Sequence, residues 1–150
     1  MQMETINNYP KISWTCKHTW KRSSVNTMWC LVGCSIGDLG TIAVFQYYAI
    51  PWPTVAIMGL AIINGLITSI ILETIILLNQ MGLRKAFSTA IGMSFISMIA
   101  MECSMNLVDL IMMGGAKLNL ITIIAMLIAG FFTPLPYNYW RLKAFGISCH

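Results

Sequence analysis

The sequence predicts an all-α protein, a transmembrane bundle of four antiparallel helices with both termini in the cytoplasm. Three observations favour this fold class. The chain of 150 residues is 57% hydrophobic and only 9% charged, whereas a soluble domain carries about 25% charged residues. Four segments reach the roughly 20 apolar residues that a helix needs to cross a bilayer. The links between these segments are short, so successive helices must run up-down-up-down.

The predicted spans divide the chain into a membrane domain, residues 25–137, and two short flanking segments. We expect the four spans at residues 25–50, 54–78, 86–113 and 118–135. Pro51 and Pro53 mark the turn after the first span, and Gly114 begins the turn before the last one. Residues 1–24 are predicted to form a cytoplasmic N-terminal segment, and residues 138–150 a cytoplasmic tail.

The basic residues determine the predicted orientation. Eight of the nine Lys and Arg residues flank the spans on one side, and only Lys117 lies on the other. The positive-inside rule places the basic side in the cytoplasm. We therefore expect a multi-pass protein of the cell membrane that contacts lipids and other integral membrane subunits. The basic residues are spread over the termini and one loop rather than gathered in a patch, so a nucleic-acid partner is not expected.

Four of the five carboxylates fall inside the predicted spans: Asp38, Glu73, Glu102 and Asp109. No Lys or Arg shares those stretches. An ionised acid at the centre of a bilayer costs at least ~2.5–3.5 kcal/mol. We therefore expect each of these acids to be protonated, buried among hydrogen-bond donors, or bound to a cation.

In the first span, Cys30, Cys34 and Asp38 follow one another at a spacing of four residues, so they share one stripe of the helix. Thiolates are soft metal ligands, and the carboxylate adds an oxygen donor. The alternative is that the two cysteines pack as small hydrophobic residues. Gly33 and Gly37 lie beside this stripe and would let a neighbouring backbone approach closely.

The third span carries a denser cluster, in which Glu102, Asn106 and Asp109 share one face and Met101 and Met105 border it. Carboxylate and amide oxygens suit protons or hard cations, whereas thioethers suit Cu(I). Alternatively, the methionines fill irregular gaps and the acids are neutral hydrogen-bond donors. The two stripes reach similar depth from antiparallel helices, so we expect that they can meet.

Two further features lie near the cytoplasmic side. Glu73 follows Gly65 and Ser69 on the second span, and we predict a structural role in which it reaches water or meets Arg84 or Lys85. Cys149 and His150 end the sequence and form a candidate metal-binding pair; the alternative is that this pair is incidental.

A proline-containing segment, residues 134–139, is expected to break the fourth helix and turn the tail along the membrane. Arg141 and Lys143 would then lie among lipid phosphates.

Catalysis by this chain alone is not expected. Both histidines lie near the termini, so no nucleophile is paired with a base at the same depth, and no nucleotide-binding or zinc-protease pattern is present. We therefore favour an accessory subunit of a larger membrane complex, with copper as the candidate ion. The alternative is a small transporter or channel for a metal ion or a proton, in which the intramembrane carboxylates line the path.

The run from Cys30 to Asp38, with its Cys-x-x-Gly-Cys-x-x-Gly-acid pattern, resembles a family of small prokaryotic four-helix membrane proteins of unknown function. The Met101-Glu102 pair, the Pro136-x-Asn138 segment and the final His150 extend the resemblance over residues 20–150. It implies the fold and the topology and no activity. In size and number of spans the chain is also similar to small subunits of the copper-dependent ammonia monooxygenase of archaea, which implies a non-catalytic subunit of a membrane oxidoreductase.

Overall fold

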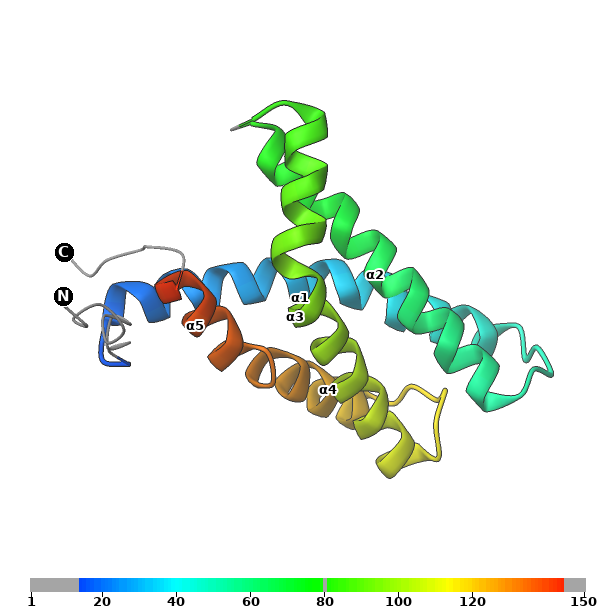
Figure 1. The fold of residues 1–150 in the computed structure, drawn as a ribbon. Coiled ribbons are helices and arrows are strands. Elements are labelled where there is room, and N and C mark those ends of the chain that lie inside the picture. Colours follow the sequence, from blue (N-terminus) through cyan, green and yellow to red (C-terminus); the bar gives the residue numbers. More distant parts are fainter. Residues whose placement is uncertain (1–13, 80, 145–150) are drawn as a thin grey trace, which may run out of the picture.

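The protein is entirely helical in the part that the computed structural model describes, residues 14–79 and 81–144 (Figure 1). Short turns join the helices α1 (Lys17–Tyr47), α2 (Thr54–Leu78), α3 (Leu83–Met113), α4 (Leu120–Phe132) and α5 (Leu135–Ala144). Within these residues, the segments that are long and apolar enough to cross a membrane are Lys17–Tyr47, Thr54–Leu78, Phe95–Met113 and Leu120–Lys143. The predicted all-α fold class is confirmed.

The first helix is longer than its predicted apolar segment. α1 begins at Lys17 rather than at residue 25, because hydroxyl side chains at Thr19, Ser23 and Thr27 continue the buried face of the helix toward its N-terminus. The Ser23 hydroxyl donates to the carbonyl of Leu135 at the start of α5 (3.3 Å). Polar residues that hydropathy assigns to a soluble segment therefore form part of a helix–helix interface.

The fourth span is interrupted rather than ended by its prolines. α4 ends at Phe132, and α5 begins at Leu135 after two intervening residues. Pro136 lies in the first turn of α5, where the missing N–H would have no partner within the helix. α5 packs against α1 (Figure 1), and the expectation that the tail turns along the membrane stays a prediction.

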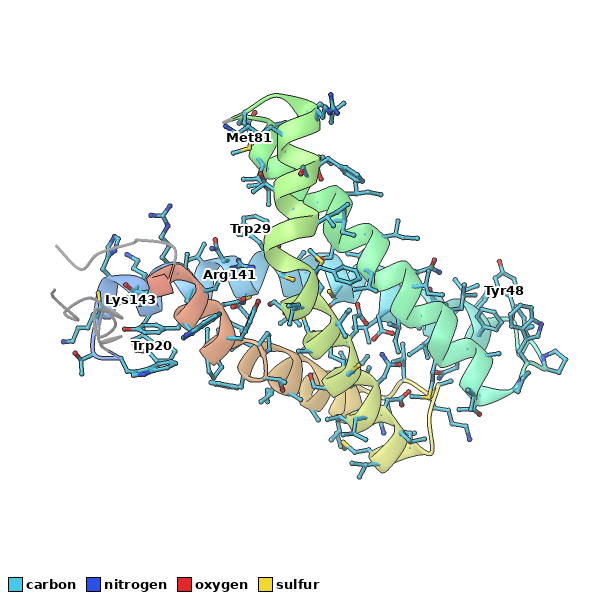
Figure 2. The ribbon with its side chains drawn as sticks, in the orientation of Figure 1. Trp20, Trp29, Tyr48, Met81, Arg141 and Lys143 are labelled. Atoms are coloured by element: carbon cyan, nitrogen blue, oxygen red, sulfur yellow. The ribbon has the colours of Figure 1, made fainter. Side chains whose placement is uncertain are left out.

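The helices form two arms that cross near the centre of the molecule (Figure 1). In one arm, α5 lies along the N-terminal half of α1 and continues from α4. In the other, α2 and α3 form a hairpin that diverges from α1 toward its tip, which Met81 marks in Figure 2. α1 packs mainly against α2, and α3 packs against α2 and α4. The polar core lies where the two arms cross.

Glycines bring α1 and α2 into backbone contact. A Cβ atom added to Gly33 would lie 2.6 Å from the Cα of Ser69, and one added to Gly37 would overlap the carbonyl group of Asn64. The Thr68 hydroxyl uses this proximity to donate to the Gly33 carbonyl (2.6 Å). The ridge that the sequence predicts at Gly33 and Gly37 is therefore the contact between α1 and α2.

Candidate intramembrane polar site

The Cys30, Cys34 and Asp38 stripe faces the interior of the bundle. Cys30 is 2% exposed, and Cys34 and Asp38 are fully buried. The stripe lies on the buried face of α1, which presents mainly small or polar residues at helical spacing. A helix built in this way needs partners for its polar groups, and α2 and α3 supply some of them.

α3 brings its own predicted site residues to the same place. Met101, Glu102, Met105, Asn106 and Asp109 are all buried, with exposures of 0 to 3%. The amide nitrogen of Asn106 donates to the Asp38 carboxylate (3.2 Å) and to the backbone carbonyl of Glu102 (3.0 Å). The two stripes therefore meet, as their depths predicted.

Glu102 is one of two acids on α3 whose carboxylate oxygens are poorly satisfied; the other is Asp109. Its carboxylate lies against the backbone of Gly65 on α2, so closely that a Cβ atom there would overlap it. Both carboxylate oxygens are buried and neither accepts a hydrogen bond of ordinary geometry. On α1, Asp38 and Cys30 act on it electrostatically and the Cys34 thiol acts on it as a hydrogen-bonding group. A second carboxylate oxygen, Oδ2 of Asp38, is also buried without a partner.

The thiols occupy the other end of this arrangement. Cys30 Sγ lies 3.5 Å from the Ser69 hydroxyl, which can donate to the Cys30 carbonyl (3.3 Å). Cys34 interacts with both Cys30 and Glu102. We call the set Cys30, Cys34, Asp38, Glu102 and Asn106 the polar cluster.

Buried methionines share the hydrophobic core with the cysteines of the polar cluster. Met98, Met101, Met105 and Met126 are fully buried in the same core as Cys30 and Cys34. Met105 packs against α4, where a Cβ atom added to Gly130 would lie 2.9 Å from its sulfur. Within the described residues, no group of three or more His, Cys, Asp or Glu side chains is arranged to hold a metal ion. Copper and its ligands therefore remain a prediction.

Asp109 has a different environment from the other acids. It is fully buried, and the backbone N–H groups of Ala116 and Lys117 stabilise its charge, although neither makes a well-formed hydrogen bond with it. These amides belong to the turn between α3 and α4, in which Gly114, Gly115 and Ala116 have positive φ angles of 77°, 97° and 52°. The Asp109 carboxylate therefore lies close to this turn. Cys149 and His150 lie outside the described residues.

Sequence reasoning missed Arg141, which belongs to α5 and is only 6% exposed. The expectations that Arg141 lies among lipid phosphates and that no fixed positive charge shares the spans are wrong. Arg141 falls within the candidate span Leu120–Lys143, and Glu73 and Cys30 are among the groups that act on its guanidinium. The available signal was its spacing of three residues from Asn138, which places both side chains on one helical face.

Comparison with known proteins identifies a family but no function. No curated protein and no solved structure matches the chain. A family model described as "Domain of unknown function (DUF4396)" matches residues 19–146, a range that holds α2, α3, α4 and α5, most of α1 and the whole polar cluster. The chain therefore belongs to this family of unknown function.

Proposed function

We propose that this protein binds a cation inside the membrane at the polar cluster and passes it from one side to the other. The observation that supports this most strongly is Glu102, a fully buried carboxylate whose oxygens accept no hydrogen bond of ordinary geometry within the described residues. Intramembrane acids in such positions commonly mark ion and proton pathways. A bound proton or metal ion would satisfy the carboxylate.

The charge balance of the polar cluster favours a cation. Asp38 and Glu102 interact with each other, and two ionised carboxylates in a low-dielectric interior repel one another strongly. Asn106 can donate to only part of this charge, because its amide nitrogen is shared between Asp38 and the Glu102 carbonyl. One bound cation would therefore relieve the repulsion and replace the missing hydrogen bonds.

The donor atoms suggest two kinds of cation. Carboxylates favour a proton, whereas the thiols of Cys30 and Cys34, together with nearby methionine sulfur, favour a soft ion such as Cu(I). Copper binding would require side chains to rearrange, or thioether sulfur from Met101 or Met105 to complete the ligand set. Asp109 would contribute only at the end of the path near the α3–α4 turn.

The orientation that we propose follows the positive-inside rule. Lys21, Arg22, Arg84, Lys85 and Lys143 lie at the ends of helices that share one side of the predicted bundle, which we call the basic side. The basic side would face the cytoplasm of the cell, and the turns after α1 and α3 would face outward.

Purified protein in liposomes provides the test. An entrapped pH dye measures proton flux, and uptake of Cu(I) or Ag(I) measures transport of a soft ion. We expect flux of at least one of these ions in the wild type and loss of that flux in Glu102→Gln. For the soft ion, Cys34→Ser is paired with Cys103→Ser, because Cys103 is an exposed thiol on α3. Absence of both fluxes in the wild type contradicts the proposal.

A second candidate function is that of a non-catalytic subunit in a larger membrane complex, such as one of the ammonia monooxygenase type. A groove of about 470 Å³ between α1 and α2 supports it. Gly37, Gly40, Thr41, Asn64 and Thr68 contribute small or polar surface to this groove, and such residues favour helix association in membranes. Purification in mild detergent tests the idea: recovery of the chain only as a monomer or homodimer contradicts it.

A further inference from the structure

Arg141 is a buried cation that the proposed cation site does not use. It is 6% exposed, and its Nε and Nη1 atoms are buried without a hydrogen-bond partner among the described residues. A guanidinium group stays protonated in proteins. This position therefore carries a permanent positive charge inside the bundle, and charged groups at such depth usually have a function.

Hydrogen bonds between α1 and α5 fix the position of Arg141. The Asn138 amide donates to the Thr27 hydroxyl (2.7 Å), and the Cys16 backbone N–H donates to the Tyr139 hydroxyl (3.3 Å). Side chains on a helix lean toward its N-terminus. α5 begins in the bundle and runs toward the basic side, so its Arg141 leans back toward the core (Figure 2).

Arg141 lies near the thiol end of the polar cluster, because Asn138 on the same face of α5 is hydrogen-bonded to Thr27 of α1. Cys30 interacts with both the Arg141 guanidinium and the Glu102 carboxylate. Along α1, Cys30 lies about one turn beyond Thr27, the residue to which α5 is hydrogen-bonded. Arg141 therefore lies between the polar cluster and the basic side of the bundle.

Glu73 is the acid whose charge acts most strongly on Arg141. It belongs to α2, which diverges from the arm of α1 and α5 toward the tip of the α2–α3 hairpin (Figure 1). The two charged residues therefore belong to helices of different arms.

From this placement we propose that Arg141 is a specificity-determining residue: its charge closes the polar cluster to cations from the basic side, so that they enter from the opposite side. The inference rests on the proposed cation site. At an effective dielectric constant of about 20 and a separation of about 6 Å, repulsion between two unit charges lowers the occupancy of a monovalent cation by roughly a hundredfold. An arginine at a constriction excludes cations in the same way in other membrane pores.

Silver ion provides the probe, because it is a small monovalent cation that binds thiols. The full-length protein is placed in membrane vesicles of both orientations and exposed to Ag(I) in nitrate buffer for increasing times. The protein is then denatured and alkylated, and mass spectrometry reports which of Cys30 and Cys34 had been protected. From the basic side, we expect Arg141→Gln to react at least tenfold faster than the wild type.

Two controls separate charge from structure. Arg141→Lys keeps the charge and Arg84→Gln removes one from the first turn of α3, so both should react from the basic side at the wild-type rate. From the opposite side, all four proteins should react equally within twofold. A variant that loosens α5 would instead react faster from both sides, which would overturn the inference.

Three further results would also overturn it: Arg141→Gln reacting within twofold of the wild type from the basic side, Arg84→Gln reacting as fast as Arg141→Gln, or folded Arg141→Lys reacting as fast as Arg141→Gln. The outcome is separable from the proposed function. Side-dependent Ag(I) access without ion flux would support the role of Arg141 and contradict transport. Ion flux without an effect of the Arg141 charge would support transport and contradict the role of Arg141.

Discussion

α1 takes part in two buried polar interfaces that differ in how their polar groups are satisfied. At the interface with α5, the hydroxyls of Ser23 and Thr27 both make hydrogen bonds with neutral partners. The atoms left unpaired on α5 belong to Arg141 and Asn138 rather than to an acid. At the crossing with α2 and α3, Asp38 and Glu102 leave three carboxylate oxygens without a partner. The first interface has the pattern of interhelical hydrogen bonds that hold membrane helices together. The second has the pattern of a binding site, because such unpaired acids are costly unless something binds them.

The strongest test of the difference between these two interfaces is a substitution at Glu102. Glu102→Gln keeps the size of the side chain and removes its charge. We expect cation binding, measured by competition with a Cu(I) chelator or by proton uptake, to weaken by about a hundredfold, or ~2.7 kcal/mol. The stability of the protein in detergent should stay the same or increase, because an uncompensated charge is removed.

Glu73→Gln is the matched control, because Glu73 lies outside the polar cluster, on α2. It should leave binding within twofold of the wild type. Equal loss of binding in both variants would contradict the special position of Glu102.

The next largest effect is expected at the α1–α5 interface. Asn138→Leu removes the hydrogen bond to Thr27, so we expect a loss of about 1.5 kcal/mol in the free energy of unfolding and no change in cation affinity. Thermal or denaturant unfolding in detergent measures the first quantity. Asn26→Leu is the control, because Asn26 is an exposed residue on α1. If Asn138→Leu abolished binding while the protein stayed folded, the two interfaces would not be separate.

A smaller effect is expected at Gly65, which borders the polar cluster. A methyl group there would overlap the Glu102 carboxylate, the far end of a flexible side chain that can move aside. We expect Gly65→Ala to weaken cation binding by about tenfold, or ~1.4 kcal/mol, with little loss of stability. Gly59→Ala on the same helix has open space around the new methyl group, so it should have no effect on binding. Unchanged binding in Gly65→Ala would show that the position of this carboxylate is unimportant.

The smallest effect is expected for Thr27→Val, which removes one hydroxyl and keeps the shape of the side chain. The loss of stability should be about 0.6 kcal/mol, the average for an interhelical hydrogen bond in a membrane protein. Thr133→Val, an exposed site whose hydroxyl bonds only within its own helix region, should cost less. The reverse order would contradict the structural role of the α1–α5 interface.

The sequence predicted the helical regions better than it predicted their ends. Hydropathy identifies α2 at Thr54–Leu78 directly, since no polar interface extends that helix. It fails at residues 17–24, where hydroxyl and basic side chains look soluble although one face of the helix packs against α5. It also fails at Pro134, because a proline that interrupts a helix and a proline that ends one look alike without the tertiary contacts that follow.

The candidate site was predictable to a similar extent. A spacing of four residues placed Cys30, Cys34 and Asp38 on one face, and antiparallel helices implied that this face could meet Asn106. The placement of Arg141 could not be derived in this way, because it depends on α5 folding back along α1. The separate environment of Asp109 depends on a turn of three consecutive residues with positive φ, which composition alone does not specify.

The backbone contact at Gly33 and Gly37 limits which substitutions these positions can accept during evolution. A methyl group at Gly37 would meet the main chain of Asn64, and main chain cannot move aside as a flexible side chain can. Family members that keep this packing should therefore hold glycine at the position of Gly37, whatever ion or partner they use. The Cβ of a larger residue at Gly33 would meet Ser69, so Gly33 and Ser69 should both be small. Substitution there would require the helix pair to separate, so we expect these two positions to vary together if they vary at all.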